Sequence, residues 1–109
     1  DGTDDAVFVK DRAGRYLLFN AAAERLVGRP AAEVLGRDDT ALFDPPGAEQ
    51  VMARDRRVMD TGRPDTAEET LTAAGVTRTY VATKAPYRDA AGAVVGVVGV
   101  SRDVTAARR

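Results

Sequence analysis

Residues 94–103 read VVGVVGVSRD, and this stretch decides the fold. Positions 94–100 hold only valine and glycine, and the polar triplet Ser101-Arg102-Asp103 follows them. A short run rich in β-branched residues favours a strand. A strand with one wet face alternates apolar and polar residues, whereas this one is apolar in both alternating sets of positions. The pattern therefore predicts a central strand that is covered on both faces.

Turn motifs place further strands beside this one. In KDRAGRY (10–16) and RDAAGAV (88–94), an Asp stands three residues before a Gly, and LTAAGVT (71–77) carries related turn chemistry. Asp at the first position of a type I turn accepts a backbone N–H, and Gly at the fourth position tolerates a left-handed backbone. The flanking segments have strand composition, so we expect strands at 6–10, 16–20, 66–73, 77–88 and 94–102. Pro86 interrupts strand hydrogen bonding, which predicts a bulge or an edge position there.

The middle of the chain carries helix signals instead. Asn20 precedes an alanine-rich segment that ends at Gly28, and Pro30 precedes a second short one. We expect helices at 21–27, 31–35 and 44–60, and a single turn with Leu42 and Phe43. Either Asp38 or Asp39 caps that turn, and the other is expected to be an exposed charge rather than a cation ligand. Strand-rich ends around a helical middle predict an α+β domain, with a five-stranded antiparallel sheet and short helices packed on one face.

Composition excludes several classes of function. Lys and Arg number 16 against 17 Asp and Glu, so there is no electrostatic footprint for nucleic acid or for an anionic membrane. The longest apolar run is far shorter than the roughly twenty residues of a membrane-spanning helix. The sequence has no cysteine and no histidine, which rules out thiolate nucleophiles, Ser-His-Asp triads and imidazole metal ligands. Glu68 and Glu69 are neighbours in a strand and point to opposite faces, so no catalytic or metal site is predicted.

The order of these elements resembles a Per-Arnt-Sim (PAS) domain. The resemblance rests on GRYLLFNAAAERLVGRPAAEVLGRDDTALF (14–43), MDTG (59–62) and KAPYRDAAGAVVGVVGVSRDVT (84–105). Asp103-Val104-Thr105 is similar to the family's Asp-hydrophobic-Thr signature, which joins the last strand to an output helix. The resemblance implies a single PAS domain at 1–105 and the beginning of a C-terminal output helix at 106–109. Because the chain begins Asp-Gly-Thr, we expect it to be a piece of a longer polypeptide.

The resemblance also implies a function. It points to a sensory or regulatory module, not itself an enzyme, in a cytoplasmic signalling protein such as those of two-component systems. Similar domains belong to histidine kinases, phosphatases, cyclic-dinucleotide enzymes and transcription regulators. The resemblance therefore implies an effector in the same polypeptide, such as a kinase, a phosphatase or a cyclase, without naming it. Asp103 and Thr105 are the candidate relay residues, and either can also cap the helix that follows. A covalent flavin adduct needs a cysteine and ordinary haem needs a histidine, so the expected ligand is a non-covalent small organic molecule, such as a fatty acid or an aromatic metabolite.

The gap between helices and sheet is the expected ligand pocket. Its candidate residues are Phe43, Met52, Asp55, Met59, Leu71, Tyr80, Val98 and Val100. For all of these except Asp55, plain core packing is the default interpretation and ligand contact is the alternative. Asp55 lies on the apolar stripe of the long helix, so it needs a partner: a backbone N–H or an arginine is favoured, and a polar anchor at a pocket rim is the alternative. Val95 and Val97 are expected on the outer face of the sheet, as candidate homodimer contacts. The alternative function is therefore a ligand-free dimerisation module.

Overall fold

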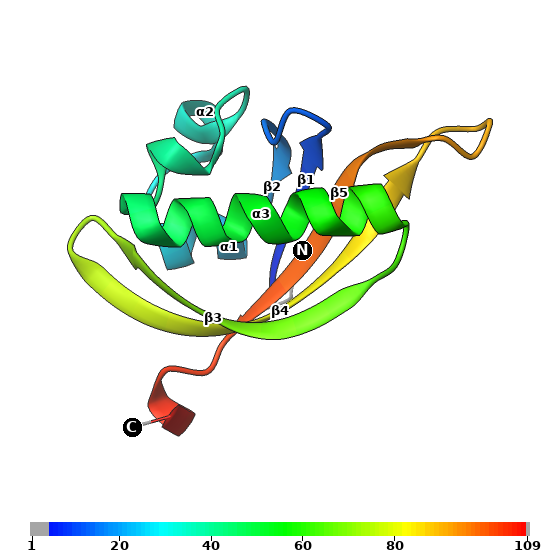
Figure 1. Cartoon of the computed structure of the whole chain (residues 1–109). Coiled ribbons are helices and arrows are strands. Elements are labelled where there is room, and N and C mark those ends of the chain that lie inside the picture. The colour runs from blue at the N-terminus through cyan, green and yellow to red at the C-terminus, as the bar shows by residue number, and fades with distance from the viewer. Residues whose placement is uncertain (1–4, 109) are drawn as a thin grey trace.

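The computed structural model describes residues 5–108. As predicted, one antiparallel five-stranded sheet is combined with helices, and the strand order is β2-β1-β5-β4-β3 (Figure 1). The strands are β1 (Ala6–Asp11), β2 (Tyr16–Phe19), β3 (Asp65–Ala73), β4 (Val76–Arg88) and β5 (Val94–Asp103). The helical elements are α1 (Ala21–Val27), α2 (Ala31–Val34), α3 (Pro45–Thr61) and the 3-10 turns η1 (Asp39–Ala41) and η2 (Ala106–Arg108).

Both Asp–Gly turns form as predicted. The Asp11 carboxylate accepts hydrogen bonds from the backbone N–H groups two and four residues further on, and Gly14 closes the turn with φ of 84°. Asp89 and Gly92 repeat this arrangement between β4 and β5, with φ of 87° at the glycine. Both glycines lie in the left-handed region, where a side chain would be strained. These local turns fix which strands become neighbours at the two ends of the chain.

Asn20 joins the first hairpin to the helical layer. Its side-chain oxygen accepts the backbone N–H of Ala23 at 2.9 Å, which caps α1 as predicted. The same oxygen accepts the backbone N–H of Val7 at 3.0 Å, so the cap also anchors α1 to β1. Gly28 ends the helix with φ of 78°.

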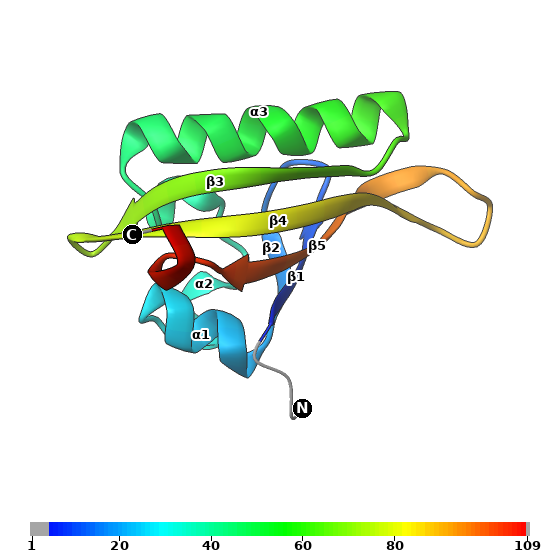
Figure 2. The ribbon, with the colours of Figure 1, turned by 90° about the horizontal axis from the view of Figure 1, so that it is seen from below.

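The helices all contact one face of the sheet. α1 packs on β1, α2 on β2, and α3 on β3, β4 and β5. Figure 1 shows α3 crossing in front of the sheet, and Figure 2 shows it running along β3 and β4. The hydrophobic core fills the space between these helices and the inner face of the sheet. Among the described residues, no helix has the length and apolar character needed to cross a membrane.

β5 is the central strand, as predicted, but over residues 97–100 its two faces are exchanged relative to the prediction. Val97 is fully buried and packs with Val58 and Met59 of α3, so its assignment to a dimer surface is wrong. Val98 and Val100 lie in the opposite set of alternating positions, and Val100 is 39% exposed on the outer face. Their assignment to the ligand pocket is therefore wrong as well.

Gly99 explains why β5 takes this orientation. It shares the inner face with Val97, and the ring of Phe8 lies directly over it. A Cβ atom at position 99 would come within 2.2 Å of that ring. The inner face therefore accepts glycine at this point, and the valines on either side of it are turned outward. Val95 is half-buried at the other end of the strand, and its part in a dimer stays a prediction.

The two ends of β4 differ in their neighbours. β3 pairs with β4 only as far as Lys84, so Pro86 lies in a segment that pairs with β5 alone, and a register irregularity follows at Tyr87/Arg88. This agrees with the predicted edge or bulge. After β5, residues Ala106–Arg108 form one 3-10 turn. The output helix expected from residue 106 stays a prediction, and Arg109 lies outside the described residues.

Candidate functional site

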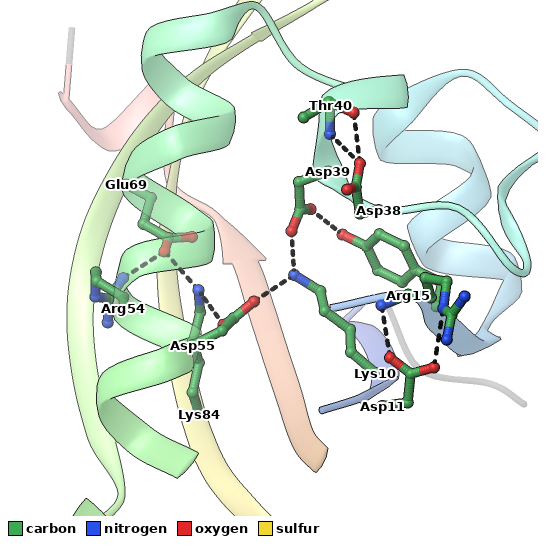
Figure 3. Close-up of polar contacts among 11 residues, drawn as sticks. Lys10, Asp11, Arg15, Asp38, Asp39, Thr40, Arg54, Asp55, Glu69 and Lys84 are labelled. Carbon is green, nitrogen blue, oxygen red and sulfur yellow. Dashed lines mark hydrogen bonds and ion pairs between the residues drawn. The ribbon is translucent and has the colours of Figure 1, made fainter. Parts of the chain in front are cut away.

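A chain of acidic and basic side chains crosses the interior between α3 and the sheet (Figure 3). Its members alternate in charge, and we call them the ionic chain: Asp39, Lys10, Asp55, Lys84, Glu69 and Arg54. Lys10, Lys84 and Asp39 are fully buried, and Asp55 is 2% exposed. Three acidic and three basic groups balance one another, which is the condition for holding charges in an interior of low dielectric.

Lys10 has both hydrogen-bond and aromatic partners for its ammonium group. Its Nζ donates hydrogen bonds of 2.5 Å to Asp39 and 2.6 Å to Asp55. The ammonium also lies over two aromatic rings, 5.2 Å from the centroid of Phe8 and 4.8 Å from that of Tyr16. The hydroxyl of Tyr16 donates to the other oxygen of Asp39 at 2.5 Å. Lys10 therefore connects β1 to both η1 and α3.

The pKa values of Lys10, Asp39 and Tyr16 are shifted by burial and by the charges of their neighbours. Burial alone would lower the pKa of Lys10, but Asp39 and Asp55 outweigh it and raise that pKa above its ordinary value. Burial raises the pKa of Asp39, and the Lys10 ammonium opposes that rise. Burial and the Asp39 carboxylate raise the pKa of Tyr16 well above its ordinary value. At neutral pH, Lys10 is thus a charged donor and Tyr16 a neutral one.

The other end of the ionic chain connects α3 to β3 and β4. Lys84 Nζ lies 2.8 Å from Glu69 and 3.0 Å from Asp55. Arg54 of α3 donates to Glu69, and its Nη2 and Nε both donate to one carboxylate oxygen of the half-exposed Asp65, at 2.7 and 3.1 Å. The hydrogen bonds from Arg54 lower the pKa of Asp65. Asp55 is therefore held from both sides, by a lysine of β1 and a lysine of β4.

Next to the ionic chain is a cavity of about 40 Å³ in the inner face, which we call the inner cavity. Its polar lining comes from Lys10, Tyr16, Glu69, Tyr80, Lys84 and Ser101, and the rest of the wall is apolar, including Phe8, Phe19, Leu26, Phe43 and Leu71. A volume of this size holds a few water molecules but not an aromatic ring, for which about 150 Å³ is enough. Leu26, Val27 and Phe43 are half-buried, so they are the wall residues with room to move outward.

The structure separates the predicted pocket residues. Phe43, Leu71 and Tyr80 line the inner cavity, whereas Met59 belongs to the core cluster beneath β5. Met52 lines a separate surface groove beside the start of α3. Asp55 is part of the ionic chain and does not line the cavity. Its partners are lysines, not the backbone N–H or arginine that the sequence favoured.

The acidic pair at the η1 turn is also partly corrected. Asp38 caps the turn by accepting the backbone N–H of Thr40 at 3.0 Å, as one of the two was predicted to do. Asp39 was expected to be the exposed charge, but it is fully buried because Lys10 and Tyr16 satisfy its oxygens. Among the described residues, no group of acidic side chains is arranged to hold a metal ion.

Residues Val104 and Thr105, where the chain leaves the sheet after β5, are hydrogen-bonded to β4, and we call them the exit. The Thr105 hydroxyl accepts the backbone N–H of Thr79 at 2.9 Å and donates to Asp103 at 2.6 Å, and Val104 donates its N–H to the Thr79 carbonyl at 2.8 Å. Asp103 also pairs with Arg78 at 3.0 Å. Although partial burial opposes it, the hydrogen bonds from Thr105 and Arg78 lower the pKa of Asp103. The hydroxyl of Thr105 thus connects the exit to both β4 and Asp103 of β5.

Sequence reasoning missed four residues that matter here: Lys10, Asp39, Glu69 and Lys84. A signal was available for the lysines, which are the only two in the chain. Lys10 shares its alternating set with buried Ala6 and Phe8, and Lys84 shares its set with buried Tyr80 and Ala82. A lysine in the buried phase of a strand requires a buried carboxylate. Three acidic residues on other elements, Asp39, Asp55 and Glu69, supply it.

Comparison with known proteins decides the family. A model described as the PAS fold matches residues 1–109. The chain belongs to the PAS family. It is 37% identical over 106 residues to the methanogenesis regulatory histidine kinase FilI of Methanothrix harundinacea, covering 96% of this chain and 12% of the kinase. It is 35% identical over 102 residues to a diguanylate cyclase of Vibrio cholerae, covering 91% of this chain and 32% of the cyclase.

A solved structure extends this likeness to the fold. VqmA bound to DPO superimposes with a TM-score of 0.82 at 26% identity, over 92% of this chain and 51% of that one. This PAS domain thus spans a third or less of the length of the two signalling enzymes it matches. The relatives are multidomain proteins in which the matching segment is one module.

Proposed function

We propose that this PAS domain is a non-enzymatic sensory module that binds a small molecule in the inner cavity and reports its presence to an effector in the same polypeptide. The effectors of the relatives, a histidine kinase and a diguanylate cyclase, support this arrangement. VqmA, which shares the fold, has been solved with DPO bound. The inner cavity is apolar over most of its wall and carries a few polar groups, which is the usual composition of a small-molecule site.

One observation carries the proposal: β4 lines the inner cavity and also holds the exit of the chain. Tyr80 lies in the cavity wall, and its neighbour Thr79 donates its backbone N–H to the Thr105 hydroxyl and accepts the backbone N–H of Val104. A ligand that moves Tyr80 therefore also moves the strand to which the exit is attached. We propose Asp103 and Thr105 as the relay on this ground.

Entry of a ligand also requires motion, because the inner cavity is smaller than an aromatic ring. Phe43 is the wall residue best placed to report this motion. It lies between η1 and α3, and Asp44, which follows it, donates its N–H to the Thr72 carbonyl of β3 at 2.9 Å. Displacing Phe43 would shift the first turn of α3 relative to the sheet. A ligand can shift such an equilibrium only through its difference in affinity for the two states.

Native mass spectrometry of freshly purified protein, followed by hydrogen exchange, tests the proposal. We expect retained small-molecule mass, and a change in exchange at the Val104 amide when that molecule is removed. Thr105→Val should raise exchange at Val104, whereas the control Thr105→Ser, which keeps the hydroxyl, should not. Absence of any adduct, together with Val104 exchange that no added molecule changes, would contradict the sensory proposal.

A second candidate function is dimerisation through the outer face of the sheet. Val98 and Val100 lie on this face together with Val7, Val9 and the exposed Leu18, which are their neighbours across β1 and β2. Sedimentation of wild type and Val100→Asp tests it, with Val76→Asp as the control because Val76 is equally apolar and 50% exposed in the β3–β4 hairpin. This function would be favoured if the ligand-free wild type and Val76→Asp are dimers and Val100→Asp is a monomer.

A further inference from the structure

Lys84 differs from the other buried lysine in how its charge is satisfied. Lys10 Nζ donates two aligned hydrogen bonds, of 2.5 and 2.6 Å. Lys84 Nζ is equally buried and lies within 3.0 Å of two carboxylates, but neither oxygen is aligned to accept a hydrogen bond from it. Among the described residues, the buried side-chain atoms without a hydrogen-bond partner are this nitrogen and Asp55 Oδ1. An ammonium has three N–H donors, and leaving them unused in the interior is costly.

The position of Lys84 makes this unused capacity relevant to ligand binding. Lys84 lines the inner cavity, and so do the hydroxyl-bearing residues Tyr80 of the same strand and Ser101 of β5. Burial raises the pKa of Tyr80 to about 12, so its hydroxyl is a neutral donor. The polar part of this wall is therefore rich in donors that a ligand oxygen or nitrogen can meet.

Charge decides which kind of acceptor fits. The acidic and basic groups of the ionic chain already balance, and Asp55 and Glu69 stand within 3.0 Å of Lys84 Nζ. An anionic ligand at Lys84 would add a negative charge beside those two carboxylates, in a cavity whose remaining wall is apolar. A cationic ligand would face the ammonium itself. A neutral acceptor meets neither penalty.

We infer that the inner cavity takes a neutral small molecule, aromatic or otherwise apolar over most of its surface, that presents a carbonyl oxygen or ring nitrogen to Lys84 Nζ. This inference rests on the proposed sensory function. It excludes the fatty-acid carboxylate, one of the two ligand classes that the sequence left open. It also makes Lys84 the residue that determines ligand specificity.

Two matched pairs of probes test the inference by NMR titration of the labelled 109-residue chain at pH 8. Benzene and pyridine are rings of the same size, and only pyridine carries an acceptor. Benzamide and benzoate have similar shapes, and only benzoate is charged. We expect pyridine to bind about tenfold more tightly than benzene, the effect of one hydrogen bond to a charged group. Benzamide should bind more tightly than benzoate, with shifts at the backbone amides of Tyr80 and Ser101 in the pyridine and benzamide complexes.

The variant Lys84→Met, which keeps the shape of the side chain, should abolish the preference for pyridine over benzene. If this variant does not fold, Lys84→Met/Glu69→Gln removes one charge of each sign and provides the same comparison. The inference is overturned if benzene binds as well as pyridine, if benzoate binds better than benzamide, or if the preference survives in the variant. If no probe shifts any residue of the cavity, the proposed ligand-binding function itself fails. The two failures are thus distinguishable.

Discussion

Replacing Lys10 with methionine tests the ionic chain most directly. Methionine keeps much of the apolar stem of lysine but removes the ammonium between Asp39 and Asp55. Asp39 would then keep only the hydrogen bond from Tyr16, and Asp55 only its unaligned contact with Lys84. Breaking a buried ion pair by removing one partner costs about 3–5 kcal/mol, because the remaining charge is buried without compensation. We expect Lys10→Met to lower the free energy of unfolding by that amount, out of a total of about 5–15 kcal/mol.

The assay is urea unfolding followed by far-ultraviolet circular dichroism, since the chain has no tryptophan. The m-value should stay unchanged, because the surface exposed on unfolding is similar in both proteins. The double variant Lys10→Met/Asp39→Asn removes one charge of each sign, so it should lose less stability than the single variant. A loss below about 1 kcal/mol in the single variant, or a larger loss in the double one, would refute a charge-balanced interior.

The pH dependence of the stability of Lys10→Met tests the same contacts independently. Without Lys10, the folded-state pKa of Asp39 should rise further above its unfolded value, because burial already raises it and Lys10 is the group that opposes the rise. A folded state that holds its proton more tightly than the unfolded state gains stability as pH falls. The deficit of Lys10→Met relative to wild type should therefore shrink between pH 8 and pH 5. A deficit independent of pH would indicate lost packing and not a buried charge.

The folded-state pKa values of Lys10, Tyr16 and Tyr80 are raised, so the unfolded chain releases these protons at lower pH than the folded chain does. The free energy of unfolding should therefore fall above about pH 10, by roughly 1.4 kcal/mol per pH unit for each group. Tyr16→Phe should reduce the slope of this alkaline decrease by one proton. Gly99→Ala places a Cβ atom 2.2 Å from the Phe8 ring and should cost about 1–3 kcal/mol in urea unfolding, with partial recovery in Gly99→Ala/Phe8→Leu. The folded-state pKa of Asp103 is lowered, so this carboxylate stabilises the fold above its unfolded-state pKa, and that stabilisation is lost on acidification. Asp103→Asn should therefore make the melting temperature less dependent on pH in the acid range. An unchanged dependence would contradict the contacts of Asp103 with Thr105 and Arg78.

The elements of the fold were predictable because their signals are local. The turns at Asp11 and Asp89, the cap at Asn20 and the valine-rich strand each depend on residues within a few positions of one another. The orientation of β5 was not predictable in this way. A strand of valine and glycine is apolar in both alternating sets, so the sequence does not distinguish its faces. The ring of Phe8 over Gly99, a contact between residues far apart in the chain, settles the choice.

The ionic chain escaped prediction for a related reason. Lys10 is 29 residues from Asp39 and 45 from Asp55, so no spacing rule connects them. Each carboxylate also had a simpler local interpretation, as a helix cap or as a partner of an arginine. What the sequence offered was a mismatch of pattern, a lysine in the buried phase of each of two strands. Such a mismatch indicates that a partner exists but does not identify it.

Lys84 belongs to both the inner cavity and the ionic chain, and this limits how binding and signalling can be separated by mutation. A ligand acceptor that draws Lys84 Nζ toward the cavity weakens its contact with Asp55, which is one of the two lysine contacts holding α3 to the sheet. Substituting Lys84 therefore changes ligand affinity and the position of α3 together. Thr105 does not line the cavity, and its hydroxyl accepts the backbone N–H of Thr79 in β4. Because the coupling between two sites is reciprocal, Thr105→Val, which releases the exit from β4, should also change probe affinity, and an affinity equal to that of wild type would contradict the proposed relay through Thr105.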